Sequence, residues 1–224
     1  MPPIGFRTNK NGKTYPIHKA KGRGGLAVAA AGTAVALSAS GGIGTGVLGG
    51  STGSSALSAA ESAVVRNIQS NLTKAQKTAR QGKPRQAWRQ LKLRQGREQA
   101  KSAVECWAFS FGQVQEFFAR TPCADLHRVQ FPLTDDNGNT VSVLVSKVRM
   151  RSTSDARELR RLIDEHGTGD IRPLVENVPF TGEHYDSKVS GKVVVLAETE
   201  PTSGEPSPVV LETISEAAVA LTPK

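Results

Sequence analysis

The chain has 224 residues, with 29 lysines and arginines, 20 aspartates and glutamates, and two cysteines. Hydrophobic residues make up 38% of it and aromatic residues only 5%, which is little for a core that spans the whole chain. We therefore expect the core to be local. Two cysteines exclude a cysteine-rich scaffold and a four-thiolate zinc site. No spacing singles out a catalytic constellation or a set of metal ligands, so we predict no catalytic residue, metal site or cofactor.

The net charge of +9 is distributed unevenly along the chain. Residues 1–24 contain six basic residues and no acid, and residues 25–105 contain eleven basic and three acidic residues. Residues 106–224 reverse the balance, with twelve basic and seventeen acidic residues. We therefore expect four regions: a basic tail at 1–24, an apolar segment at 25–50, a linker and basic stalk at 51–105, and a folded domain at 106–224.

Residues 5–15 of the tail place Asn11 and Gly12 between Phe6 and Tyr15, which is a short hairpin signal. An isolated hairpin is only marginally stable in water. We therefore expect an unstructured basic tail and keep the hairpin as the alternative.

No charged residue lies between Arg23 and Glu61, and residues 26–37 are an apolar run followed by small residues. A basic segment, an apolar run and small residues follow one another in this order in secretory signals. Extended to Leu48, the run could also cross a bilayer as a helix, although its glycines weaken that helix. Both a cleaved signal and a retained anchor stay open. A linker in a cytosolic protein is the alternative.

The charges beside this run predict its orientation, because lysine and arginine are retained on the cytoplasmic side of a membrane. An anchored chain would keep residues 1–23 inside and place the rest outside. A cleaved chain would be secreted.

From residue 56 to residue 105, helix-forming alanine, glutamine, lysine and arginine predominate. The pattern predicts two helices, at about 57–80 and 85–105, separated by residues 82–84. The first carries a narrow apolar stripe that could pack against a partner helix. The stripe contains Leu57, Val64, Ile68 and Leu72.

Basic residues around such helices suit phosphate groups or an anionic membrane surface. We interpret the stalk first as a solvated spacer, and keep nucleic-acid binding by residues 61–105 as an alternative, since no base-reading motif accompanies the charge. The candidate contacts with a polyanion or a membrane surface are Lys19, Lys21, Arg23, Arg85, Arg89, Lys92, Arg94 and Arg97.

Residues 106–221 predict an α+β domain. An aromatic helix, with Phe111, Val114, Phe117 and Phe118 on one face, ends before Pro122. Two alternating runs at 129–133 and 141–145 flank Asn137-Gly138 and predict a β-hairpin. A helix from Ser152 to Gly167, a strand at 193–197 and a helix from Ser207 follow. The order α-β-β-α-β-α indicates a small antiparallel sheet with helices on one face.

Cys106 and Cys123 flank the aromatic helix. An unbroken helix would hold their Cα atoms roughly 25 Å apart, beyond the ~4.4–6.8 Å of a disulfide. A bridge therefore requires a short helix, 111–120, with 107–110 folded back. Export would place the pair in an oxidising compartment, so we expect the disulfide; two buried thiols are the alternative.

One polar cluster lies in the connection before the last strand, at residues 183–186. With Asp170 or His166, it could hold a cation or serve an enzyme, but we interpret it as a solvated loop. Its members are Glu183, His184, Tyr185 and Asp186.

Five features follow one another in the domain: the motif at 111–118, Pro122-Cys123, the hairpin, the Gly167-Thr168-Gly169 turn and the alanine-rich last helix. In these features the chain resembles exported proteins of actinobacteria that have an extracytoplasmic α+β domain. The resemblance covers residues 106–221 and implies location and layout, without an activity. We therefore expect a non-enzymatic, envelope-associated protein whose α+β domain binds a partner outside the membrane. A cytosolic nucleic-acid-binding protein is the alternative.

Overall fold

The computed structural model describes residues 5–8, 14–17, 57–175 and 178–222. The chain divides into two compact units, residues 1–56 and residues 57–224. The apolar run at 26–48 lies outside the described residues, as do Lys19, Lys21 and Arg23.

The described part of the first unit is a short antiparallel hairpin. Strand β1 (Gly5–Thr8) pairs with strand β2 (Thr14–Ile17), with Arg7 opposite Tyr15. The pairing of these two strands agrees with the hairpin alternative, and Asn11 and Gly12 lie outside the described residues.

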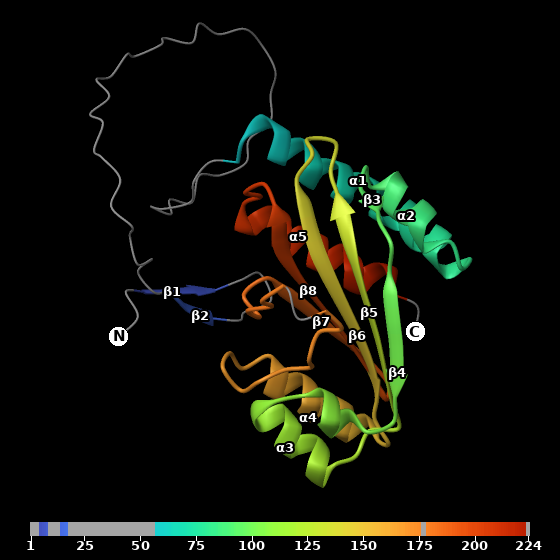
Figure 1. Ribbon diagram of the computed structural model, residues 1–224, viewed down its shortest axis with the longest axis vertical. Helices are drawn as coiled ribbons and strands as arrows, with labels where there is room; N and C mark the ends of the chain where they lie inside the picture. Colours follow the sequence, from blue (N-terminus) through green and yellow to red (C-terminus); the bar gives the residue numbers. More distant parts are fainter. Residues whose placement is uncertain (1–4, 9–13, 18–56, 176–177, 223–224) are drawn as a thin grey trace, which may run out of the picture. The chain divides into compact units, whose positions relative to one another are not determined.

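The second unit is built on an antiparallel sheet of six strands (Figure 1). The central strands β5 and β6 form a hairpin, β6 pairs with β8, and β8 pairs with β7. The free side of β5 is shared by β3 and β4. The strands are β3 (Arg94–Gln95), β4 (Gln99–Ala103), β5 (Asp125–Thr134), β6 (Thr140–Arg149), β7 (Tyr185–Ser190) and β8 (Val193–Ser203).

Helices lie before, within and after the strand sequence. They are α1 (Ala59–Arg80), α2 (Pro84–Gln90), the 3-10 helix η1 (Cys106–Phe109), α3 (Gly112–Arg120), α4 (Thr153–Ile163) and α5 (Pro208–Leu221). The α+β class is confirmed. The predicted order holds from α3 to α5, except that the connection expected before the last strand contains β7.

The β5–β6 hairpin confirms the Asn-Gly prediction. Asp135 Oδ1 accepts hydrogen bonds from the backbone N–H groups of Asn137 and Asn139, each at 2.9 Å, and Gly138 has a φ of +87°. Because Asp135 satisfies these two donors and the glycine accommodates the positive φ, the turn sets a register with Thr134 opposite Thr140.

One face of the sheet packs against α1, α2 and α5. Side chains alternate between faces along a strand, so Phe131, Val143 and Val195 all point to this side. Buried residues from these helices and from the end of α2 complete the cluster: Val64, Ile68, Trp88, Leu91, Leu93, Leu211, Ile214 and Ala218. The stripe of the first helix thus finds its partner helix within the same unit.

Glu61 ties α1 to α5. Its Oε2 accepts from the backbone N–H of Ser58 at 3.0 Å, while Ser58 Oγ accepts from the backbone N–H of Glu61. The Oε1 atom accepts from the backbone N–H of Ser207, the N-cap of α5, at 2.8 Å. The hydrogen bonds from Ser58, and then those from Ser207, lower the pKa of Glu61 to about 2.

The opposite face of the sheet is also covered, by α3 and α4. Leu126, Val148, Val194 and Leu196 alternate with the residues of the first cluster and form a second one. Figure 1 shows α3 and α4 lying side by side at one end of the sheet. The expectation of helices on one face is therefore wrong, because a six-stranded sheet with apolar residues on both faces needs cover on both.

The predicted stalk does not stand apart from the α+β domain. The compact unit begins at Leu57, and the second stalk helix ends at Gln90 instead of residue 105. Residues 94–95 and 99–103 are strands, because the edge of β5 offers unpaired backbone groups that they satisfy. Leu91 and Leu93, two residues apart and both buried, were a signal against a continuing helix.

Candidate functional site

An open groove of about 460 Å³ lies on the sheet face that also carries α2 and α5. Its floor is apolar and includes Val129 and Phe131 of β5 and Val145 of β6. Trp88 of α2 closes one side, with its ring centroid 5.9 Å from that of Phe131. Leu221, at the end of α5, lines the groove with Ala218. The volume and lining are typical of sites for small apolar ligands.

The groove exists because the helices leave part of this face uncovered. α2 is only seven residues long and ends at Gln90, so it reaches the β5 strand near Phe131. α5 ends at Leu221 and packs mainly over β7 and β8. Val129 remains half-buried between them.

The two ends of the groove differ in their polar groups. At one end, His127 and Lys147 stand opposite each other on β5 and β6. His127 Nδ1 lies 2.9 Å from Ser102 Oγ on β4. The other end carries Gln95 and Glu98.

The Gln95 end carries a carboxylate, that of Glu98. Gln95 Nε2 donates to Glu98 Oε2 at 2.8 Å, and Gln95 Oε1 is buried with no partner among the described residues. Because Gln95 stands opposite Leu133 of β5, six residues after His127, the two ends are separated by roughly 20 Å along the strand.

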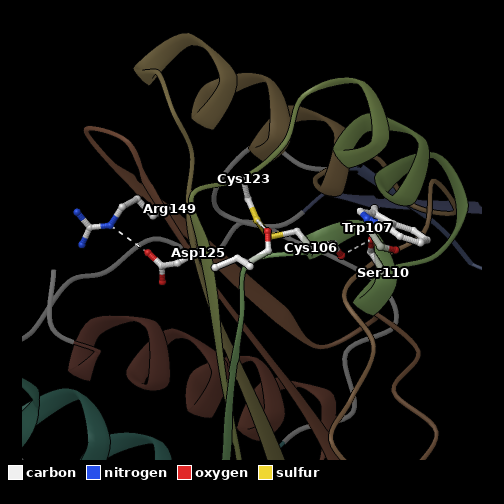
Figure 2. The surroundings of a disulfide bond; sticks show 7 residues. Cys106, Trp107, Ser110, Cys123, Asp125 and Arg149 are labelled. Carbon is white, nitrogen blue, oxygen red and sulfur yellow. Dashed lines mark hydrogen bonds and ion pairs between the residues drawn. A yellow bond between two sulfur atoms is a disulfide. The ribbon is translucent and has the colours of Figure 1, made fainter.

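The expected disulfide joins Cys106 to Cys123, with their Cα atoms 6.1 Å apart (Figure 2). As the sequence required, the helix between them is short, and η1 folds the chain back before α3 begins. Both cysteines are buried in the cluster under α3 and α4. The bridge therefore fastens η1 and α3 to the start of β5.

Two aromatic residues beside this bridge are exposed, although Phe111 is expected on the apolar face of the aromatic helix. Trp107 is 50% exposed, and Phe111 is the N-cap of α3 and 41% exposed. Phe111 lies 5.8 Å from the guanidinium carbon of Arg172. Val114, Phe117 and Phe118 are buried as predicted.

The five predicted cationic contacts within the described residues are all exposed, and they lie in α2, in β3 and in the two connections that follow them. Arg85 and Arg89 are four residues apart on α2 and share a face of that helix. Lys92 lies in the turn after α2 with a φ of +62°, Arg94 is in β3, and Arg97 is in the connection to β4. None of the five lines the groove.

The polar cluster at 183–186 is not assembled into one site. Tyr185 and Asp186 are successive residues of β7, so their side chains point to opposite faces of the sheet. Tyr185 Oη donates to Asp164 Oδ1, and that oxygen also accepts from Ser187 Oγ at 2.9 Å. Within the described ranges, no group of three or more histidine, cysteine, aspartate or glutamate side chains is arranged to hold a metal ion.

Two buried polar residues of β5 occupy positions that the alternation of the strand predicts to face solvent. Gln130 Oε1 accepts from the backbone N–H groups of Leu174 and Val175 at 2.9 and 3.0 Å. Arg128 Nη1 donates to the carbonyl of Arg172 at 2.7 Å, and its guanidinium carbon lies 4.5 Å from the centroid of the Phe109 ring. Burial lowers the pKa of Arg128. Both side chains hold the connection after α4 against the sheet.

None of the helices in the described ranges is long and apolar enough to cross a bilayer. The segment for which a signal or anchor is expected is not among those ranges.

Comparison of the chain with protein-family models, with curated proteins and with solved structures finds no match. The groove, its polar ends and the disulfide are therefore the features on which a function can be argued.

Proposed function

We propose that this chain is an envelope-associated binding protein, whose second unit lies outside the membrane and holds a small apolar ligand in the groove between α2 and α5. The observation that carries the proposal is the groove itself. Phe131 and Val145, apolar residues that belong to the core of the sheet, line an opening of about 460 Å³. A concave site with an apolar lining and a few polar groups at its ends is typical of small-ligand binding.

Two features support an extracytoplasmic location. The Cys106–Cys123 disulfide suits an oxidising compartment, and the basic and apolar segments at 1–37 have the order of an export signal. The resemblance to exported actinobacterial proteins agrees with both. Cleavage and retention of the apolar segment remain alternative forms of the same proposal.

Fluorescence of an apolar probe, N-phenyl-1-naphthylamine, tests ligand binding by the full chain. Ala100 of β4 is exposed and lines the groove, so Ala100→Trp should fill part of the groove without disturbing the core. The matched control is Lys101→Trp, which places the same ring at the next position of the same strand and on its other face. We expect the probe affinity to fall about ten-fold or more in Ala100→Trp only. Equal affinities in the two variants would contradict ligand binding at this groove.

Fractionation with a membrane-impermeant thiol reagent tests the location. The expected result is a protein in the envelope or the culture medium that resists labelling until it is reduced. A protein found in the cytosol with both thiols reactive would contradict the proposed location.

A second candidate is contact with a polyanion through Arg85, Arg89, Lys92, Arg94 and Arg97, and the exposure of all five favours it. A gel shift by the full chain that weakens steeply with salt would support this function. Absence of binding at low salt would remove it.

A further inference from the structure

We propose that the ligand of the groove is an amphipathic anion, a long-chain carboxylate, bound with its carboxylate between His127 and Lys147 and its hydrocarbon chain along the floor toward Trp88. This inference rests on the proposed function and names the ligand class and its orientation. It is argued from the charges at the two ends of the groove and from the apolar floor between them.

The His127 end offers hydrogen-bond donors and positive charge. His127 and Lys147 are direct cross-strand neighbours, so a single carboxylate can reach both. Lys147 also has a partner within the protein, but an ammonium group carries three N–H donors, so an additional acceptor can be accommodated. Hydrogen bonds in which a donor and an acceptor are both charged are among the strongest in proteins.

The opposite end disfavours a carboxylate. Glu98 carries a negative charge, and Gln95 uses its amide N–H to bind that carboxylate while its oxygen stays buried and unpaired. A second anion placed there would meet a like charge. The groove is thus polarised, and an anionic ligand binds in one direction only.

The floor between the ends fits a hydrocarbon chain. Val129, Phe131 and Val145 provide aliphatic and aromatic surface, and Trp88 and Leu221 form apolar sides. None of these five side chains carries a charge, and the stretch from His127 to Phe131 spans roughly 13 Å of strand. A chain lying along it exchanges contact with water for contact with apolar side chains.

The test compares three ligands of equal chain length: dodecanoate, dodecanol and dodecylamine. Displacement of N-phenyl-1-naphthylamine from the full chain measures each affinity below the micellar range. We expect dodecanoate to bind about ten-fold or more tightly than the other two. Equal affinities for all three would overturn the charge argument and leave apolar binding by the groove intact. No displacement by any of them, with no probe binding, would remove the proposed function as well.

The charged end is tested by Lys147→Met and His127→Gln. The matched control is Lys188→Met, which removes one exposed positive charge from β7, on the same face of the sheet and outside the groove lining. Dodecanoate affinity should fall about ten-fold in Lys147→Met and less in His127→Gln, with dodecanol affinity unchanged in both. An unchanged dodecanoate affinity in folded Lys147→Met and His127→Gln would overturn the assignment of the carboxylate to this end.

The orientation has its own readout, because Trp88 contacts Phe131, which lies roughly 13 Å along β5 from His127. In a Trp107→Phe background, Trp88 is the one remaining tryptophan of the two in the chain. Dodecanoate with bromine on its terminal carbon should quench Trp88 fluorescence, and dodecanoate with bromine beside the carboxylate should quench it much less. The reverse order would overturn the proposed direction of binding.

Discussion

Reduction of the Cys106–Cys123 disulfide should lower the free energy of unfolding by about 3 kcal/mol. The bridge joins residues separated by 17 positions, and in the chain-entropy model the closure of a loop of this length removes about 10 cal/mol/K from the unfolded chain. At room temperature this corresponds to about 3 kcal/mol. For a folded unit of this size, the melting temperature should fall by about 6–12 °C.

Replacement of both cysteines by alanine should cost more than reduction. Both cysteines are buried, 2% and 4% exposed, in the cluster that contains Phe117 and Phe118. Reduction keeps both sulfur atoms in that cluster, whereas the double alanine variant also loses their packing. We expect a further loss of about 1–2 kcal/mol.

Urea denaturation of the full chain separates the two effects. The oxidised protein should be the most stable and the double alanine variant the least stable. The reduced protein, with reduction verified by alkylation of its thiols, should lie between them. Unfolding free energies are compared, and not midpoints alone, because a cross-link makes the unfolded chain more compact and lowers the m-value. The double alanine variant with reductant is the control, and should not respond. Coincident free energies for oxidised and fully reduced protein would refute the loop-closure reasoning.

Three further predictions concern the stability of the second unit. Glu61→Gln should lower the free energy of unfolding by about 1 kcal/mol at neutral pH, because it weakens hydrogen bonds to Ser58 and α5 that lie near solvent. The folded pKa of Glu61 is about 2 against an ordinary 4.5, so the difference from wild type should disappear as pH falls from about 4.5 to about 2. A difference that stays constant across that range in urea titrations would contradict this reasoning. Gly169→Ala should cost roughly 3 kcal/mol or more, because the added Cβ would lie 2.1 Å from the Phe111 carbonyl oxygen. Gly167→Ala, at a similar positive φ in open space, should cost only about 1 kcal/mol. Equal melting temperatures of the two variants would refute the steric argument. Thr199→Val should cost about 1–2 kcal/mol by urea denaturation, since the buried hydroxyl bonds to a carbonyl and a hydroxyl of α5; a variant as stable as wild type would show those bonds to be dispensable.

Elements specified by their own local sequence were predicted well. Ser152 Oγ accepts from the backbone N–H of Asp155, as the cap signal indicates, and α5 starts after Ser207 with Pro208. The end of α4 was predicted less accurately: the helix stops at Ile163, before Gly167. Thr168 Oγ1 donates to the carbonyl of Leu162, in the last turn, and to that of Glu165, just after it. A side chain that returns to cap a helix is visible only once the chain has turned.

The strands at the edges of the sheet were harder to predict. β4 has an almost fully exposed sequence, and it is a strand because β5 needs a partner on that side. β7 does alternate, with Tyr185, Ser187 and Val189 on one face, but polar residues fill its other positions. Edge strands bury little of their own surface, so their conformation follows from the neighbour they pair with more than from their composition.

Some features of the candidate site could likewise be predicted from local sequence, and others could not. The sequence by itself determined the cysteine pair, the short helix that a bridge requires, the central hairpin and the uneven distribution of charge, since each depends on residues close together in the chain. Only the tertiary structure decided that helices cover both faces of the sheet, and that Trp88, Val129, Val145 and Leu221 meet around one groove. These residues come from four elements, spread over more than half of the chain, and the opening between them is set by where two helices end, which no local pattern encodes.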